Sequence, residues 1–314
     1  MRVFVAGATG VVGRRLVPML VGAGHSVTGM TRSAAKSDAI RALGAEPAVA
    51  DALDAGAVRL AVGRAKPEVV IHQLTALPAN LNIRDLKREA EPTNRLRTLG
   101  TDYLLAAAKH AGTRRFIAQS YGGWMFSRHS GPVMTEEDVP DPDPPVAIRE
   151  VVAAIAYVER TVPAAHGMEG LVLRYGGFYG PGTAFGAGGG MLQQVRQRRV
   201  PVIGAGTGVW SFLHIDDAAA ATVAAVERGR PGVYNIADED PAQVSVWLPE
   251  LARILGAKPP RRIPSWLARL LIGEHGVAVM TTARGLSNAK AKRNLGWQPH
   301  WATWREGFRR GLGG

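Results

Sequence analysis

Three glycines spaced three residues apart, Gly7, Gly10 and Gly13, make a pattern near the start of the chain that suits a phosphate. They follow an apolar run typical of a buried strand and precede apolar residues at helical spacing. A phosphate can approach such a turn because no side chain blocks it, and the free N–H groups and dipole of the following helix attract negative charge. The spacing is a variant of the dinucleotide fingerprint. We expect this turn to bind a dinucleotide through Gly7, Thr9, Gly10, Val11, Val12 and Gly13. The alternative is a glycine turn that binds no ligand.

The end of the second predicted strand indicates which dinucleotide this is. About 20 residues past the glycine turn, a carboxylate would bind a ribose 2′-hydroxyl and an arginine would accommodate a 2′-phosphate. Here the chain has Thr31 and Arg32, with Lys36 one helical turn on, and no carboxylate. A guanidinium suits a phosphate, so we expect NADP(H) in preference to NAD(H). The alternative is that Arg32 is a solvated loop residue.

The composition excludes several classes of protein. A chain of 314 residues that is 46% apolar can bury a large core. It contains no cysteine, signal peptide or apolar run long enough for a membrane span, so we expect a cytoplasmic protein. The net charge of +12 comes from scattered arginine pairs, and seven of the 38 basic residues are lysine. We therefore expect solvated faces, no nucleic-acid partner and no membrane partner.

Alternating strands and helices must position these residues. The apolar pattern predicts strands at 3–6, 25–30, 46–50, 68–73, 115–120, 170–175 and 233–236. Helices lie between them, with Asp54 as an N-cap and a break at Pro92 before a long helix at 93–111. Alternation of this kind implies parallel βαβ crossovers. We expect the acidic, proline-rich segment 136–145 to be a lid over a cleft or a plain solvated loop.

The predicted fold class is α/β, a Rossmann-type doubly wound parallel sheet with a smaller, mostly helical C-terminal substrate lobe. Residues 1–176 form the dinucleotide-binding domain, to which 211–236 return, and residues 177–210 and 237–314 form the substrate lobe.

Nine stretches in the same order resemble the extended and atypical short-chain dehydrogenase/reductases, in particular the NAD(P)-dependent epimerase/dehydratase group. They are GATGVVG at 7–13, DALD at 51–54, VIHQLTA at 70–76, Asn94 with Gly100-Thr101, RFI at 115–117, LRYGGFYGPG at 173–182, FLHIDDA at 212–218, YNI at 234–236 and LGWQP at 295–299. The resemblance implies that Asp51, Ala52 and Leu53 lie by the adenine. It places Leu74, Thr75 and Ala76 by the ribose and phosphates, and Tyr175 to Phe178 near the nicotinamide. It also implies that His214, Asp216 and Asp217 are mainly structural.

The chain departs from this family at its catalytic pair. Members usually exchange a proton through a Tyr-x-x-x-Lys pair, in which the lysine lowers the pKa of the tyrosine. None of the six tyrosines here has a lysine four residues on, and alignment on Glu159 puts Val151 and Ile155 at the two positions. The family's catalytic Ser/Thr falls on Tyr121, with Ser120 one residue early. We therefore expect Tyr121, Ser120 or a water to supply any proton.

Two further departures concern the substrate. Gly177 stands where nucleotide-sugar enzymes often have an asparagine, and Trp210 stands in place of an arginine that holds a diphosphate. The site loses an arginine that would bind an anion and gains the indole of Trp210. This exchange favours an apolar or aromatic substrate. Four more aromatic side chains either line such a pocket or pack in the core: Trp124, Phe126, Phe178 and Phe185.

Three functions are compatible with these residues. The first is an NADP(H)-dependent oxidoreductase of a small, mostly apolar carbonyl or conjugated substrate. The second is a non-redox isomerase or cyclase that keeps the cofactor as a structural element, and the third is a protein that senses or binds NADP(H) without chemistry. We expect a small-molecule substrate and no metal. A homodimer is compatible with the sequence.

Overall fold

The computed structural model describes residues 1–77, 85–123 and 131–313. Within them the central sheet has seven strands, all parallel, in the order β12-β7-β5-β4-β1-β2-β3. Their bounds are β1 Arg2–Ala6, β2 Ser26–Thr31, β3 Glu46–Val49, β4 Val69–His72, β5 Arg115–Tyr121, β7 Glu169–Tyr175 and β12 Gly232–Ile236. The predicted α/β class and doubly wound sheet are confirmed.

The central strands are apolar runs because helices cover both of their faces. In β1, Val3 pairs with Val27 of β2 on one side and Val69 of β4 on the other, and each is nearly inaccessible to solvent. Alternate residues of each strand enter the two apolar clusters that lie on opposite faces of the sheet.

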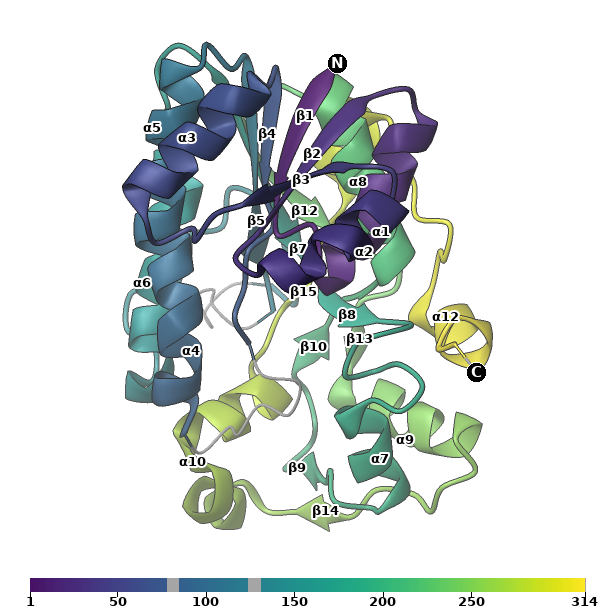
Figure 1. Cartoon of the computed structure of the whole chain (residues 1–314). Helices are drawn as coiled ribbons and strands as arrows, with labels where there is room; N and C mark the ends of the chain where they lie inside the picture. The colour runs from purple at the N-terminus through teal and green to yellow at the C-terminus, as the bar shows by residue number, and fades with distance from the viewer. Residues whose placement is uncertain (78–84, 124–130, 314) are drawn as a thin grey trace.

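Helices form one layer on each face of this sheet (Figure 1). One layer holds α1 Val11–Gly22, α2 Ser37–Ala42 and α8 Ile215–Glu227, whose apolar residues share a cluster. The other layer holds α3 Ala55–Ala65, α4 Leu86–Arg95, α5 Thr101–His110 and α6 Arg149–Thr161. Short 3-10 turns, Ala34–Lys36 (η1) and Val146–Ile148 (η4), precede α2 and α6.

Pro92 does not break the helix, which corrects the sequence prediction. It lies inside α4, which continues through a π-helical turn, η3 Leu96–Gly100, into α5. A proline inside a helix costs about 3 kcal/mol. Leu86 and Ala90 of the same helix are buried against Ile155 of α6 and its neighbours, and burial of this kind offsets the cost.

The rest of the chain packs below the sheet in Figure 1. It contains four strand pairs, β8 Gly177–Tyr179 with β11 Phe212–His214, β9 Val202–Ile203 with β14 Arg262–Ile263, β10 Val209–Trp210 with β13 Ala242–Gln243, and β6 Val133–Met134 with β15 Gly285–Leu286. Its helices are α7 Gly190–Arg196, α9 Val244–Ile254, α10 Ser265–Thr281, α11 Ala289–Leu295 and α12 Trp304–Arg310. A separate aromatic core, with Phe212, Trp247 and Phe308, holds α7, α9 and α12 together. The helix α11 instead packs against α8 and β12.

The extended segment 209–214 is divided at Ser211. The Ser211 carbonyl accepts a hydrogen bond from the N–H of Gly177 at 2.8 Å, and its hydroxyl accepts one from the N–H of Leu286 at 2.8 Å. Two distant segments therefore bond to this one residue, which separates β10 from β11.

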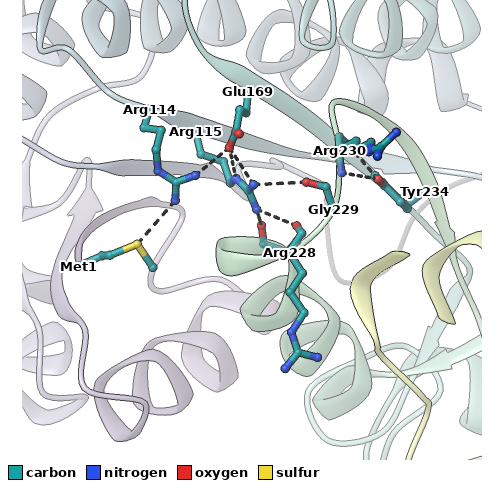
Figure 2. A network of polar contacts seen from close by, with 9 residues as sticks. Met1, Arg114, Arg115, Glu169, Arg228, Gly229, Arg230 and Tyr234 are labelled. Atoms are coloured by element: carbon teal, nitrogen blue, oxygen red, sulfur yellow. Dashed lines mark hydrogen bonds and ion pairs between the residues drawn. The ribbon is translucent and has the colours of Figure 1, made fainter. Parts of the chain in front are cut away.

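A buried arginine fastens the sheet to α8 at the edge where the strands begin (Figure 2). The guanidinium of Arg115, the first residue of β5, donates to Glu169 of β7 at 2.8 Å and to the carbonyls of Ala225, Arg228 and Gly229 at the end of α8. These carbonyls have no partner within their own helix. The hydrogen bonds of Arg115 therefore fix the sheet at the edge where the strands begin. The opposite edge, where the strands end, is left for a site.

None of the helices in the described ranges is long and apolar enough to cross a membrane. In the same ranges no group of three or more histidine, cysteine, aspartate or glutamate side chains is arranged to hold a metal ion.

Candidate functional site

The glycine turn between β1 and α1 leaves no room for side chains. A Cβ on Gly7 would lie 2.7 Å from the Gln73 carbonyl oxygen, and Gly7 has φ +97°. A Cβ on Gly13 would lie 2.2 Å from the Gly7 carbonyl oxygen. Gly10 is the N-cap of α1, and its N–H donates to Gly7 O at 3.0 Å. A side chain at Gly7 or Gly13 would collide with the backbone of the turn, so only glycine fits at these two positions.

The N-terminus of α1 has the features of an anion site. Its N-cap residue, Gly10, has no side chain to cap the helix, and the first turn contains no acidic residue. Among the described residues, no protein group accepts a hydrogen bond from the N–H of Val11, Val12 or Gly13. Free N–H groups and the helix dipole at this point suit a pyrophosphate, so the turn fits the cofactor expected from the sequence.

The end of β2 places two cations beside this turn with nothing to neutralise them. Thr31 is buried, and its hydroxyl accepts a hydrogen bond from the N–H of Ser33 at 3.3 Å. Arg32 and Lys36 are exposed, and in the described part of the chain neither forms an ion pair or a hydrogen bond through its side chain. Both side chains are therefore available to a phosphate.

The segments after β3 and β4 are ordered by local hydrogen bonds. The Asp51 carboxylate accepts from the N–H of Leu53 at 2.9 Å, and Ala52 between them is buried. Asp54 caps α3 by accepting from the N–H of Ala57 at 3.0 Å, which confirms the predicted cap.

After β4, the chain is tied to both neighbouring elements. The Leu74 carbonyl accepts from Gln119 of β5 at 3.0 Å, and the N–H of Ala76 donates to the hydroxyl of Thr93 in α4 at 3.0 Å. Thr75 lies between these two anchors. The segment therefore follows the edge where the strands end, which is where ligands bind in open parallel sheets.

Tyr175 is buried in the protein core, which corrects one expectation. Its hydroxyl bonds to Gln73 at 2.9 Å and to Thr222 of α8 at 2.7 Å, and burial raises its pKa to about 12. The ring of Phe178 is half-buried, with its centroid 5.3 Å from that of Tyr175. The Tyr175 ring has no exposed surface for a nicotinamide, so Phe178 is the aromatic side chain of this segment that a cofactor can reach.

Ser120 is part of a buried ion-pair network and not a free hydroxyl. Its Oγ donates to Glu159 Oε1 of α6 at 2.6 Å. The same carboxylate accepts from Arg174 Nε at 2.9 Å and from Arg174 Nη2 at 2.6 Å, and both charged side chains are buried. Arg174 also donates to Asn235 Oδ1 at 3.1 Å. The Ser120 hydroxyl therefore has a carboxylate as its partner, and its role as a proton donor stays a prediction.

Tyr121 lies at the end of β5 and remains half-buried. Its ring packs against an apolar cluster that contains Ile155 and, at its margin, Val151. Those two residues stand where the family has tyrosine and lysine, so this part of the site is apolar. Of the two predicted proton donors, Tyr121 is the one that packs against this apolar cluster.

The aromatic residues expected around a substrate lie in different places. The indole N–H of Trp210 donates to the carbonyl of Val279 at 2.9 Å, and its ring lies 4.8 Å from that of Trp247. Phe185 is buried in the same aromatic core. These two side chains pack within the lobe, and Trp210 remains partly exposed. Trp124 and Phe126 lie outside the described residues.

The acidic segment 136–145 is anchored at its beginning. Glu136 accepts a hydrogen bond from the N–H of Asn235 in β12 at 2.8 Å. Asp138 forms an ion pair of 2.8 Å with the buried Arg284, which holds the pKa of that carboxyl below its usual range, together with hydrogen bonds from Thr135. Its first residues are thus neither a free lid nor a plain solvated loop.

Two buried basic residues near the strand ends were missed by sequence reasoning. His72 ends β4, donates from Nε2 to the Leu96 carbonyl at 3.2 Å, and has its pKa lowered to about 4 by burial. Arg97, in η3, is 9% exposed, and burial lowers its pKa to about 10. The signal was present for Arg97, because it lies four residues from both Thr93 and Thr101, on the buried face of its helix.

The chain matches the model of the NAD dependent epimerase/dehydratase family over residues 3–237. It is 46% identical to a 3-diazoavenalumate denitrifying reductase from a Streptomyces species, over 99% of this chain and all of the relative. It is 27% identical to a 4-hydroxy-2-methyl-3-oxo-4-farnesyl-3,4-dihydroquinoline-1-oxide ketoreductase from Stigmatella aurantiaca, over 82% of this chain and 74% of the relative.

Among solved structures, the fold is similar to that of a UDP-glucose 4-epimerase from Thermotoga maritima with UDP-glucose. The TM-score is 0.75 at 24% identity, with 99% of this chain and 97% of the other covered.

Proposed function

The chain belongs to the NAD dependent epimerase/dehydratase family, and on that premise we propose that it is an NADP(H)-dependent reductase that removes dinitrogen from a small aromatic diazo compound. Membership makes it an NAD(P)-dependent oxidoreductase or epimerase-like enzyme. The preference for NADP(H), the substrate and the reaction are the proposal. They refine the sequence expectation of a small conjugated substrate.

The residues that would hold the cofactor come from four segments. The glycine turn and the start of α1 would take the pyrophosphate, and Arg32 and Lys36 would take the 2′-phosphate. Residues 51–53 would lie by the adenine and residues 74–76 by the ribose and phosphates. Support for this assignment comes from the cradle that a Cβ would fill and from the two cations without partners.

The observation that carries the proposal is that the described residues of the site lack the family's usual proton relay. Val151 and Ile155 occupy the positions of the usual pair, and Ser120 is bound to Glu159. A carbonyl reductase must deliver a proton to the developing alkoxide. Reduction of an aryl diazonium ion requires no proton. The missing relay would therefore not prevent this reaction.

When bound, the reduced nicotinamide supplies a hydride that replaces the nitrogen: a C–H bond forms, the C–N bond breaks, and its electron pair leaves with dinitrogen. The charge of the diazonium ion is cancelled by that of the hydride, so the reaction is balanced without a proton. The apolar surface of Ile155 and its neighbours would exclude water, which otherwise competes for the same carbon.

The test is incubation of the purified protein with 3-diazoavenalumate and NADPH. We expect NADPH oxidation, release of ¹⁵N₂ from terminally and internally labelled substrate, and transfer of deuterium from labelled NADPH to the ring carbon. Reactions without protein control for chemical reduction. Cofactor binding without enzyme-dependent release of nitrogen would contradict the proposed reaction.

A second candidate is carbonyl reduction with Tyr121 as the proton donor. Its support is the position of Tyr121 at the end of β5 and the similarity to a ketoreductase. The same protein and NADPH tested on a panel of ketones, aldehydes and enones distinguish the two candidates, because only this second one requires the phenol.

A further inference from the structure

Arg97 is a largely buried cation whose guanidinium is not bonded to any other described residue. Only 9% of the residue is exposed, and no described residue forms a hydrogen bond or ion pair with its guanidinium. A guanidinium has five N–H donors. Because its nitrogen atoms are not among the buried atoms that lack a partner, they are open to solvent and can bind a molecule from outside the chain.

The charges around Arg97 do not balance within the protein. The carboxylate that interacts with it is Glu159, but that carboxylate already accepts two hydrogen bonds from Arg174 and one from Ser120. Two buried guanidinium groups therefore share one carboxylate. His72 adds no charge at neutral pH because burial keeps it neutral. Among these buried, described groups, the positive charges outnumber the negative charges by one.

This charge lies at the edge of the sheet where ligands bind. Arg97 interacts electrostatically with Tyr121, the last residue of β5, and with His72, the last residue of β4. Its π-helical turn packs against α6 and is tied to β4 by the hydrogen bond between His72 and the Leu96 carbonyl. Single π-turns inside longer helices occur frequently at functional sites.

We propose that Arg97 binds the carboxylate of the substrate and thereby selects anionic aromatic compounds over neutral ones. The inference rests on the proposed function for the aromatic nature of the substrate. A carboxylate fits the forked guanidinium in two parallel hydrogen bonds and supplies the missing negative charge. The arginine would fix one end of the substrate and so determine which ring carbon reaches the nicotinamide.

The test is a binding experiment that needs no turnover. Calorimetric titration of the protein loaded with NADP⁺ compares 4-hydroxycinnamate with its methyl ester, in the parent and in Arg97→Met and Arg97→Lys. Arg95→Met, two residues earlier with half of its side chain exposed, is the matched control. NADPH affinity and thermal unfolding are measured for each variant.

We expect Arg97→Met to weaken binding of the acid at least tenfold and leave the ester unchanged, while Arg97→Lys retains part of the preference and Arg95→Met all of it. NADPH affinity and the unfolding temperature should not fall in Arg97→Met, since no hydrogen bond or ion pair between described residues is lost and the long apolar side chain keeps the packing. Equal loss of acid and ester, no preference in the parent, or weakened NADPH binding would each overturn the inference. If Arg97→Met does not fold, a reduced preference for the acid in Arg97→Lys supports the inference, and an unchanged preference in Arg97→Lys refutes it.

The two proposals fail separately. Binding of the acid through Arg97 without release of nitrogen from a diazo substrate would refute the reaction alone. Nitrogen release at equal kcat/KM from a diazo acid and its ester would refute the role of Arg97 alone.

Discussion

Ser120 donates a hydrogen bond of 2.6 Å to Glu159, and Glu159 is at the same time the ion-pair partner of Arg174. The hydroxyl that the sequence places beside the missing catalytic pair is thus committed to a buried carboxylate. A reaction at this site takes its proton from one of the predicted donors, Tyr121, Ser120 or a water, or uses no proton at all.

Replacement of Tyr121 distinguishes the two candidate reactions. If the hydride replaces dinitrogen, Tyr121→Phe should keep kcat within about threefold, because the phenol exchanges no proton. If the reaction is carbonyl reduction, loss of the general acid should lower kcat by roughly 10²-fold or more. Steady-state kinetics with NADPH measures both. Tyr103→Phe, on α5, serves as the control for loss of a phenol elsewhere.

Replacement of Arg32 tests the cofactor preference. Arg32→Ala should weaken NADPH binding about tenfold or more, as a charge-assisted hydrogen bond to phosphate is worth roughly 1.5–3 kcal/mol. NADH binding should change by less than about twofold. Calorimetric titration with both cofactors measures the difference, and Arg41→Ala, an exposed arginine on α2, is the control. Equal weakening of both cofactors would contradict the phosphate role.

A methyl group on Gly13 should disrupt the glycine turn. Gly13→Ala puts a Cβ 2.2 Å from the Gly7 carbonyl oxygen, so the helix must move away from the strand. We expect cofactor binding to be lost and the free energy of unfolding to fall. Gly63→Ala, in α3 with open space around its Cβ, should instead stabilise the protein by about 0.5–1 kcal/mol. Urea unfolding of both variants gives the comparison, and similar stabilities would argue against a close-packed turn.

Removal of the charge on Glu159 should destabilise the fold. Glu159→Gln leaves Arg174 buried without its carboxylate, and breaking a buried pair in this way costs about 3–5 kcal/mol. The exposed pair between Lys87 and Glu150, at the start of the same helix α6, gives the control, since Glu150→Gln should cost at most about 1 kcal/mol. Equilibrium unfolding in urea measures both. A small loss in Glu159→Gln would mean that the network contributes little to stability.

His72 should make stability depend on pH below neutrality. Burial lowers its pKa to about 4, from 6.5 in an unfolded chain. The unfolded state therefore binds more protons between these values, and stability is lost as the pH falls from about 6.5 toward 4. The expected contribution is roughly 2 kcal/mol between pH 7 and pH 5.

Comparison with His72→Asn isolates this contribution from that of other buried groups. Urea unfolding at pH 7 and pH 5 should show a smaller loss in the variant than in the parent. The same loss in both would mean that His72 is not held neutral by the fold.

Much of the scaffold could be predicted from short stretches of sequence. The runs at β1 and β4, the turn from Gly7 to Gly13 and the Asp54 cap depend on residues within one or two turns of each other. Sterics and hydrophobic periodicity act over that range, so local patterns specify them. The cofactor residues follow from the same patterns and stay predictions.

What the sequence by itself determined is the order of strands and helices, the glycine turn, and the absence of the tyrosine and lysine pair. The tertiary structure alone decided where the polar groups found partners: Ser120 bonds to Glu159 and Tyr175 to Thr222, while the Arg97 guanidinium bonds to no other described residue. The paired residues lie 39 and 47 positions apart. Whether a buried charge is satisfied depends on every element that packs around it, and no local pattern carries that information.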